Sequence, residues 1–454
     1  MNSNRLRHPA PCLRRAAWLA VVAALALPIT ARAQDEAGSA PDTTSLSSDT
    51  TGTVPKDSYA NMTAGEFTPA RGFDLVRTER GSLNISGYGL FRSLSQFPGN
   101  QTYTDHLGRT RTVGAKNDIN WHRTFVWLTG FFGDPRFRYN ISIWSLGSTE
   151  QTLVFGNLQY RASRPLTLGV GIGPNLTNRS LQGSWPFWAG SDRQMMEEAL
   201  RGGFASAFWI TGQPIDRVYY TASINRSLSQ LGITAAQDNR DFSYSASTWW
   251  MPTTGEFGPR GGFGDFEHHE QVATRFGASA CTAREGRYAP DDQSPRHSQI
   301  RLSDSVNPFE TGALADTVTV QTLTYQNVSF DAGFKYRGFS FQGEYTVRRL
   351  SDFVATGPLP LSKIVDQGFF VQAMHMVVPK RLGLYATTSY ITDDFKRFPW
   401  EVSGGASYYP YGSRSWRLNL HFIHVEKSMA GSSFGYYVAG QTGNTISLGT
   451  DILL

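Results

Sequence analysis

Hydrophobic and polar residues alternate along most of the chain with a period of two, which is the spacing of a β-strand whose two faces meet different surroundings. The end of the chain is the clearest example. One face of this final segment carries the apolar residues Ile446, Leu448, Ile452 and Leu454, together with Thr450. Asn444, Ser447 and Asp451 do not suit a core on both sides of the strand. Such one-sided segments of about 10–12 residues are typical of a transmembrane antiparallel β-barrel, so we predict an all-β chain of that class.

The alternating pattern recurs often enough to predict about 16 strands. The segments are residues 82–93, 119–132, 136–146, 151–161, 164–173, 202–213, 215–227, 241–252, 271–283, 323–337, 338–350, 367–378, 381–392, 399–410, 414–427 and 444–454.

The connections between these segments alternate in length. Tight turns of Gly, Pro, Asp and Ser fall at 133–135, 162–165, 212–214, 337–338, 379–380 and 411–413. Long connections fall at 94–118, 174–201, 228–240, 284–322, 351–366 and 428–443. This asymmetry predicts short periplasmic turns, long outer loops and two periplasmic chain ends. Residues 147–150, a short outer loop, and 253–270, a long inner connection, break the rule.

The two faces of the late strands differ in kind. In 338–348 one face is aromatic or aliphatic, and the other carries Gln342, Glu344 and Arg348. Charges would cost several kcal/mol in lipid, so the polar face is predicted to line the lumen. A soluble antiparallel sandwich also alternates. The start of the chain and its apolar final strand favour the membrane barrel.

The chain begins with an export signal. Basic residues precede a short apolar run, and Ala31-Arg32-Ala33 resembles a cleavage site, so we expect 1–33 to be a signal peptide. Residues 34–79 are expected to form a flexible periplasmic segment and 80–454 the barrel. Without the five arginines of the signal, 37 basic residues face 37 acidic ones. That balance does not favour nucleic acid as a partner.

Several segments resemble a known family. They are residues 248–277, Gln299–Asp304, Phe309–Leu314, Tyr336–Ser340 and Met376–Lys380. With them the chain resembles the phosphate-selective porin O and P family of outer-membrane channels, over most of 80–454 and most strongly from about 240 on. The resemblance implies a 16-stranded barrel in the bacterial outer membrane, a homotrimer, and passage of small anions.

The third outer connection, 174–201, is a candidate constriction. Ser191 followed by Gln194 is typical of a helix start, and an inward-folded helical loop with mixed charge would narrow the pore. A lid outside the pore is the alternative. The residues predicted to line the pore or to bind solute are Arg179, Arg193, Arg201, Lys335, Arg337, Arg348, Arg417 and His421, opposed by Asp331, Glu344 and Glu401. Arginine exceeds lysine, either through genome composition or because guanidinium forks grip oxyanions.

The acidic and histidine-rich stretch Asp265–Glu270 favours a polar periplasmic plug or turn over a metal site, because adjacent histidines on an extended chain point apart. The scattered histidines single out no nucleophile–base pair, so we expect no enzyme and no cofactor. The sequence predicts a water-filled channel for small anionic or polar solutes, with membrane lipid as its surroundings. The alternative is a surface or anchoring barrel without transport.

Overall fold

The computed structural model describes residues 72–147, 151–182, 188–228, 241–258, 263–287, 298–431 and 435–454. The predicted signal peptide, residues 34–71 of the segment expected to be flexible, and residues 183–187 of the third outer connection lie outside the described residues. None of the described helices is long and apolar enough to cross a membrane.

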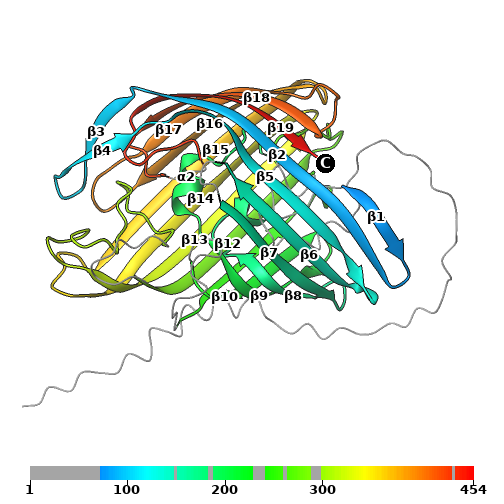
Figure 1. Ribbon diagram of the computed structural model, residues 1–454, viewed down its shortest axis with the longest axis horizontal. Helices are drawn as coiled ribbons and strands as arrows, with labels where there is room; N and C mark the ends of the chain where they lie inside the picture. The colour runs from blue at the N-terminus through cyan, green and yellow to red at the C-terminus, as the bar shows by residue number, and fades with distance from the viewer. Residues whose placement is uncertain are drawn as a thin grey trace, which may run out of the picture. The chain divides into compact units, whose positions relative to one another are not determined.

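Sixteen antiparallel strands form the barrel wall (Figure 1). They are β2 (Gly81–Phe97), β5 (Asn117–Phe132), β6 (Asp134–Leu146), β7 (Gln151–Arg161), β8 (Thr167–Pro174), β9 (Phe204–Ile215), β10 (Val218–Asn225), β11 (Ser243–Trp250), β12 (Ala273–Gly286), β13 (Val320–Tyr336), β14 (Phe339–Ala355), β15 (Lys363–Val378), β16 (Leu382–Thr392), β17 (Trp400–Tyr408), β18 (Trp416–Glu426) and β19 (Gly443–Leu453). Each corresponds to one predicted segment, so the strand count is confirmed.

The wall closes between its last and first strands. β19 pairs with β2 from Asn444 opposite Phe97 to Leu453 opposite Tyr88, and β2 pairs on its other edge with β5. The amide of Leu454 donates to the carbonyl oxygen of Gly87 at 2.8 Å. The chain end is therefore part of the closed sheet, and no edge is left along this seam.

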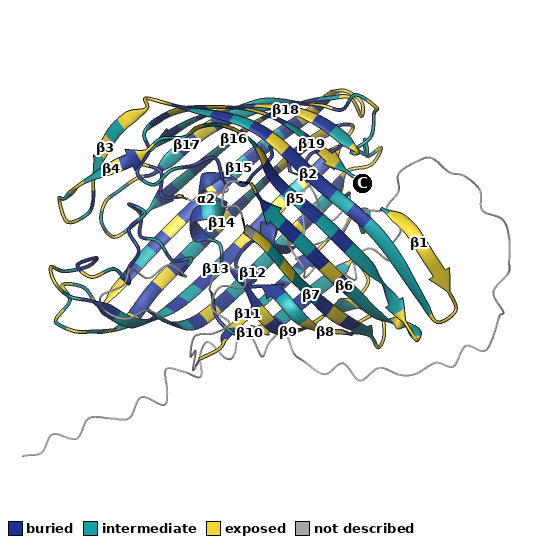
Figure 2. Cartoon of the chain, viewed as in Figure 1, coloured by how far each residue is buried: buried dark blue, intermediate teal, exposed yellow. Residues whose placement is uncertain are grey.

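The predicted faces are confirmed along the late strands. Phe341 is 41% exposed on the outside of β14, whereas its neighbour Gln342 is 1% exposed on the inside. Figure 2 shows this alternation of exposed and buried residues along strand after strand. Leu448 on β19 is 58% exposed and Ser447 is 2% exposed. The outside is thus an apolar belt for lipid, and the inside is polar.

Arg337 corrects the predicted alternation. Strand β13 ends at Tyr336, and Arg337-Gly338 forms the two-residue connection to β14, with φ values of 44° and 83°. Positive φ at both central residues is the type I′ geometry that matches strand twist. Arg337 is exposed, and its guanidinium lies over the Tyr336 ring at 5.1 Å. This residue belongs to the periplasmic turn and does not line the pore.

Two hairpins were missed by the sequence reading. β1 (Phe73–Thr78), within the segment expected to be flexible, pairs with the start of β2, and its residues are exposed. β3 (Asn100–Thr104) and β4 (Thr110–Gly114) form a hairpin in the first outer connection. Both lie beyond the membrane-spanning pattern, where short strands carry no one-sided alternation.

A charge on the apolar belt gives a direct test of the faces. Phe330, 58% exposed on β13, lies opposite Tyr345 in the middle of the belt. Phe330→Arg is expected to destabilise the folded barrel by roughly 2–4 kcal/mol, because the guanidinium enters hydrocarbon. Tyr411→Arg is the matched control: Tyr411 is 73% exposed in the turn after β17, and its change should be near neutral. Urea titrations of folding into lipid vesicles measure both, and equal effects would contradict the assigned lipid face.

Candidate functional site

The third outer connection lies inside the barrel. It leaves β8 after Pro174 and enters β9 at Phe204. The amide of Arg179 donates to Glu344 on β14 at 3.1 Å, and the hydroxyl of Ser407 on β17 donates to the Ala189 carbonyl oxygen at 2.9 Å. These two strands belong to the far wall. The connection therefore crosses the lumen, which confirms the inward fold and excludes a surface lid.

The helix in this connection begins later than predicted. α2 spans Met195–Leu200 after an N-cap at Gln194 that makes no side-chain capping bond. Ser191, the predicted cap, instead bonds through its amide and hydroxyl to the Tyr436 hydroxyl, each at 2.8 Å. The Met195 amide donates to Glu401 of β17 at 2.9 Å. The Glu401 carboxylate of the barrel wall thus accepts the kind of amide hydrogen bond that an N-cap side chain usually accepts.

An apolar cluster of the inner wall, here called the apolar seat, includes the helix. Phe125 and Trp127 of β5 stack at 5.3 Å, and Phe125 stacks with Trp144 of β6 at 5.5 Å. Met196 and Leu200 of α2 belong to the same buried cluster, and α2 itself lies against β15 and β16, where Met196 packs beside Gly368. Burying side chains of this size contributes roughly 1.5–3 kcal/mol each, so the seat gives the docked loop much of its stability.

Asp192 fixes the loop electrostatically. Its carboxylate accepts hydrogen bonds from Arg92 of β2 at 2.7 Å and from Arg123 of β5 at 2.8 Å. All three side chains are at most 6% exposed. Two buried guanidiniums around one carboxylate are charge-assisted bonds in a low-dielectric site, so each charge depends on the others.

The described parts of the long inner connection, residues 251–258 and 263–272, meet the outer loop inside the barrel. The guanidinium of Arg179, at the start of the short 3-10 helix η3 (Arg179–Gln182), lies 5.3 Å from the Phe257 ring and 4.8 Å from the Phe263 ring. Arg179 also donates to the Gln342 amide oxygen. Lys335 of β13 donates to the Phe257 carbonyl oxygen at 2.8 Å. Two predicted pore-lining cations therefore hold the junction of the two connections.

His269 organises the inner connection. Its Nε2 lies 2.6 Å from Glu256, and its Nδ1 bonds to Asp265, whose carboxylate also accepts from the Gly338 amide at 2.7 Å. Burial lowers the pKa of His269, but the bonds to the two carboxylates outweigh burial and raise the pKa to about 9. The stretch Asp265–Glu270 thus bonds to the turn between β13 and β14, and whether it acts as a plug or a turn stays a prediction. No cluster of metal-ligating residues is found in the described part of the chain.

The other predicted residues are paired on the inner face or in the loop. Arg193 donates to Ser180 at 3.1 Å and lies over Trp188, and Arg201 pairs with Glu198 at 2.9 Å. The strand residues also have partners: Arg348 with Asp366 at 2.5 Å, Arg417 with Asp451 at 2.7 Å, and His421 with the Tyr385 hydroxyl at 2.8 Å. Of the opposing acids, Asp331 pairs with Arg275 at 3.0 Å.

Sequence reasoning missed Arg92, Arg123 and Arg275 as lumen residues. Arg275 is buried and its neighbour Phe276 is exposed, so the alternation along β12 could have identified Arg275 as a lumen residue. Arg92 and Arg123 gave a weaker signal, because apolar residues occupy both faces of β2 and β5 near them.

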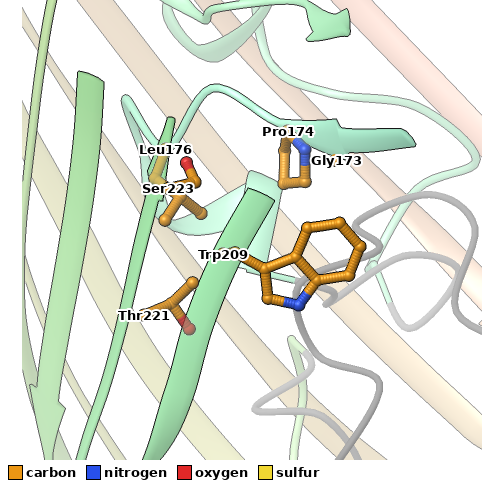
Figure 3. A pocket seen from close by; sticks show the side chains of 6 residues that line it. All are labelled: Gly173, Pro174, Leu176, Trp209, Thr221 and Ser223. Carbon is orange, nitrogen blue, oxygen red and sulfur yellow. The ribbon is translucent and has the colours of Figure 1, made fainter. Parts of the chain in front are cut away.

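Most inward-facing side chains from β2 round to β19 are buried. Buried residues of the third outer connection and of later outer loops share apolar clusters with them. A recess between β8, β9 and β10 is too small to hold a water molecule; its lining is Gly173, Pro174, Leu176, Trp209, Thr221 and Ser223 (Figure 3). Among the described residues, the inward-facing side chains are therefore largely shielded from solvent.

Comparisons with known proteins identify the fold. OmpT of Vibrio cholerae, expressed in the outer membrane, aligns with a TM-score of 0.51 at 11% identity, over 84% of this chain and 99% of that chain. The trimer form of in-vitro folded OmpT gives a TM-score of 0.50 at 12% identity, over 83% and 100%. No family model and no curated protein matches the sequence. The chain has the fold of an outer-membrane β-barrel, and the narrower phosphate-selective family is not confirmed.

Removing the charge of Asp192 should loosen the outer loop. Asp192→Asn leaves Arg92 and Arg123 buried without their counter-charge, a change that costs roughly 3–5 kcal/mol in comparable buried pairs. Hydrogen exchange of amides 188–200 should accelerate by at least ten-fold. The control is Asp134→Asn, which breaks an exposed pair with Arg136 and should leave this exchange unchanged. Unaltered protection of 188–200 in Asp192→Asn would contradict the anchoring role.

The inner connection should weaken in alkali. A folded pKa of about 9 exceeds the ordinary 6.5, so the stabilisation by protonated His269 is complete below about pH 6.5 and is lost as pH rises through about 9. Melting temperatures of wild type and His269→Gln between pH 6 and 10 measure the effect. The stability difference between the two proteins should shrink as pH rises, since other titrating groups cancel in it. A constant difference would refute the ion pair.

Proposed function

We propose that this protein is an outer-membrane channel for small hydrophilic solutes, captured in a closed arrangement. The observation that carries the proposal is the content of the lumen: charged side chains line the wall, and the chain's own connections fill the space between them. Sixteen strands enclose enough room for an aqueous bore once such a filling moves. A barrel built only for anchoring has no need of buried charge, which is expensive to keep dry.

The path opens where the outer loop leaves its seat. Displacement of residues 188–200 would expose Arg92, Arg123 and Asp192 to water at once, together with Arg417, which donates to the Trp188 carbonyl oxygen at 2.7 Å. A wetted wall of this kind conducts ions and small polar molecules. Solutes pass by diffusion, with no chemical step.

A weak preference for anions is the finer part of the proposal. Most cations that face the lumen have carboxylate partners, so the net electrostatic field along the lumen is small. Lys335 donates to the Phe257 carbonyl oxygen, and the Arg179 guanidinium lies over the Phe257 ring. These two cations lie at the junction of the two connections. Brief guanidinium and ammonium contacts would favour small anions, including phosphate, without stopping flux.

We also infer a homotrimer, the form named for one similar structure. The apolar belt of a single barrel serves lipid or a second copy equally well. The mass of the purified assembly in native mass spectrometry distinguishes a trimer from a monomer.

The closed surface or anchoring barrel is the second candidate, favoured by the burial of the inward faces. Planar-bilayer recordings separate the two. For a channel, wild type should conduct in small or infrequent steps, and Asp192→Asn should raise conductance or open probability several-fold. Asp134→Asn should match wild type.

Reversal potentials in a salt gradient give the selectivity in the same recordings. Lys335→Gln should shift them toward cations. Silence of wild type and Asp192→Asn alike, with both proteins folded, would support the anchoring barrel, and cation preference in wild type would refute the anion reading.

A further inference from the structure

A basic group on the outside of the barrel has no part in the channel. Arg284 of β12, Arg349 of β14 and Lys363 of β15 face outward at the ends of their strands that lead into or out of the outer loops. The neighbours of Arg349 in the chain, Arg348 and Leu350, are buried on the inner face, so Arg349 points outward. We propose that these three residues bind the phosphate groups of an anionic lipid in the outer leaflet of the membrane.

The strand register brings the three cations together. Arg349 is opposite Val365 and Lys363 is opposite Ser351, so Arg349 and Lys363 are diagonal neighbours on adjacent strands. Such neighbours lie about 7–8 Å apart and are within reach of long side chains. Arg284 is opposite Thr324 on β13, which in turn is opposite Ser351. The three heads therefore share one stretch of the rim, four strands wide.

The height of the group matches the edge of the hydrocarbon. Ten residues separate Phe339, at the periplasmic end of β14, from Arg349. At about 3.3 Å per residue and a tilt of 35–45°, they span about 25 Å, the height of the apolar belt of such barrels. Arg349 thus lies at headgroup level, where a cation costs little and a phosphate is within reach.

The surface below the group suits acyl chains. Phe330, Tyr345 and Phe369 lie opposite one another across β13, β14 and β15, and they are 58%, 41% and 40% exposed. Counted along β14, this aromatic row lies two outward-facing residues closer to the periplasmic end than Arg349. Cations above a row of apolar rings fit a molecule with a charged head and hydrocarbon tails, which inorganic phosphate lacks.

The cations are available for a ligand. The guanidinium of Arg284 is held in place by the hydroxyls of Thr322 at 2.7 Å and Thr324 at 3.2 Å and by the Asp352 carbonyl oxygen at 3.1 Å. The heads of Arg349 and Lys363 make no hydrogen bond or ion pair with any residue that the structure describes.

Two carboxylates lie close to the basic group. Asp352 is exposed beside Arg284. Asp394 accepts from the Val365 amide at 2.8 Å, in the part of β15 beyond its pairing with β16. The bond places Asp394 on the β16 side of β15, away from Arg349. The group stays net positive, which favours an anionic head.

Native mass spectrometry of the full-length protein in detergent tests the proposal, with diphosphorylated lipid A and its dephosphorylated form as probes. Wild type should bind the phosphorylated lipid at least ten-fold more tightly. Arg284→Gln, Arg349→Gln and Lys363→Gln together should remove most of that preference. Changing Arg337 and Lys380, exposed cations of the periplasmic turns, to Gln should leave it intact.

Three results would overturn the proposal: equal binding of the two lipids by wild type, an unchanged preference in the triple variant, or displacement of the lipid by millimolar inorganic phosphate. Loss of binding in EDTA would also overturn it, because it would assign the phosphate contact to a bridging metal ion on Asp352 or Asp394. Should the triple variant fail to fold, Arg349→Gln alone, at the centre of the group, should weaken binding at least three-fold.

Discussion

The carboxylate of Asp192 is the contact on which the arrangement of the lumen depends. Arg92 and Arg123 are built into strands that pair with each other, so the sheet holds their backbones side by side on the inner wall whether or not the loop is present. Neither can stay dry without an anion. The loop supplies that anion, and α2 packs against β15 and β16 within the apolar seat. Charge selects the position of the loop, and apolar burial strengthens it.

The strands of the barrel wall could be predicted from the sequence because the alternation that defines each strand involves only neighbouring residues. Each strand shows its two faces through neighbours in the chain: Phe341 against Gln342, or Leu448 against Ser447. Sixteen such segments and their alternating turns were enough to give the strand count. The same logic placed Lys335, Arg348, Arg417 and His421 on the inner face. It failed for Arg337, because β13 ends one residue earlier than predicted.

The filling of the lumen was harder to predict, since it depends on contacts between residues far apart in the chain. Ser191 has the sequence signature of a helix cap, but Tyr436 competes for it and Glu401 caps the helix from across the barrel. Likewise, the apolar seat was hidden in β5, where Phe125, Val126, Trp127 and Leu128 follow one another and assign no face. Local propensity yields to a tertiary partner at each of these points.

A seat that combines ion pairs with apolar contacts suits a part that moves. Water entering the lumen would solvate Arg92, Arg123 and Asp192. This solvation would offset much of the free energy lost when their hydrogen bonds break, because the attraction between buried ions is only slightly larger than the cost of removing them from water. The apolar contacts of Met196 with the wall have no such compensation, and they set the free energy that keeps the loop docked. Opening is therefore limited by a small apolar patch, although the most conspicuous contacts are ionic.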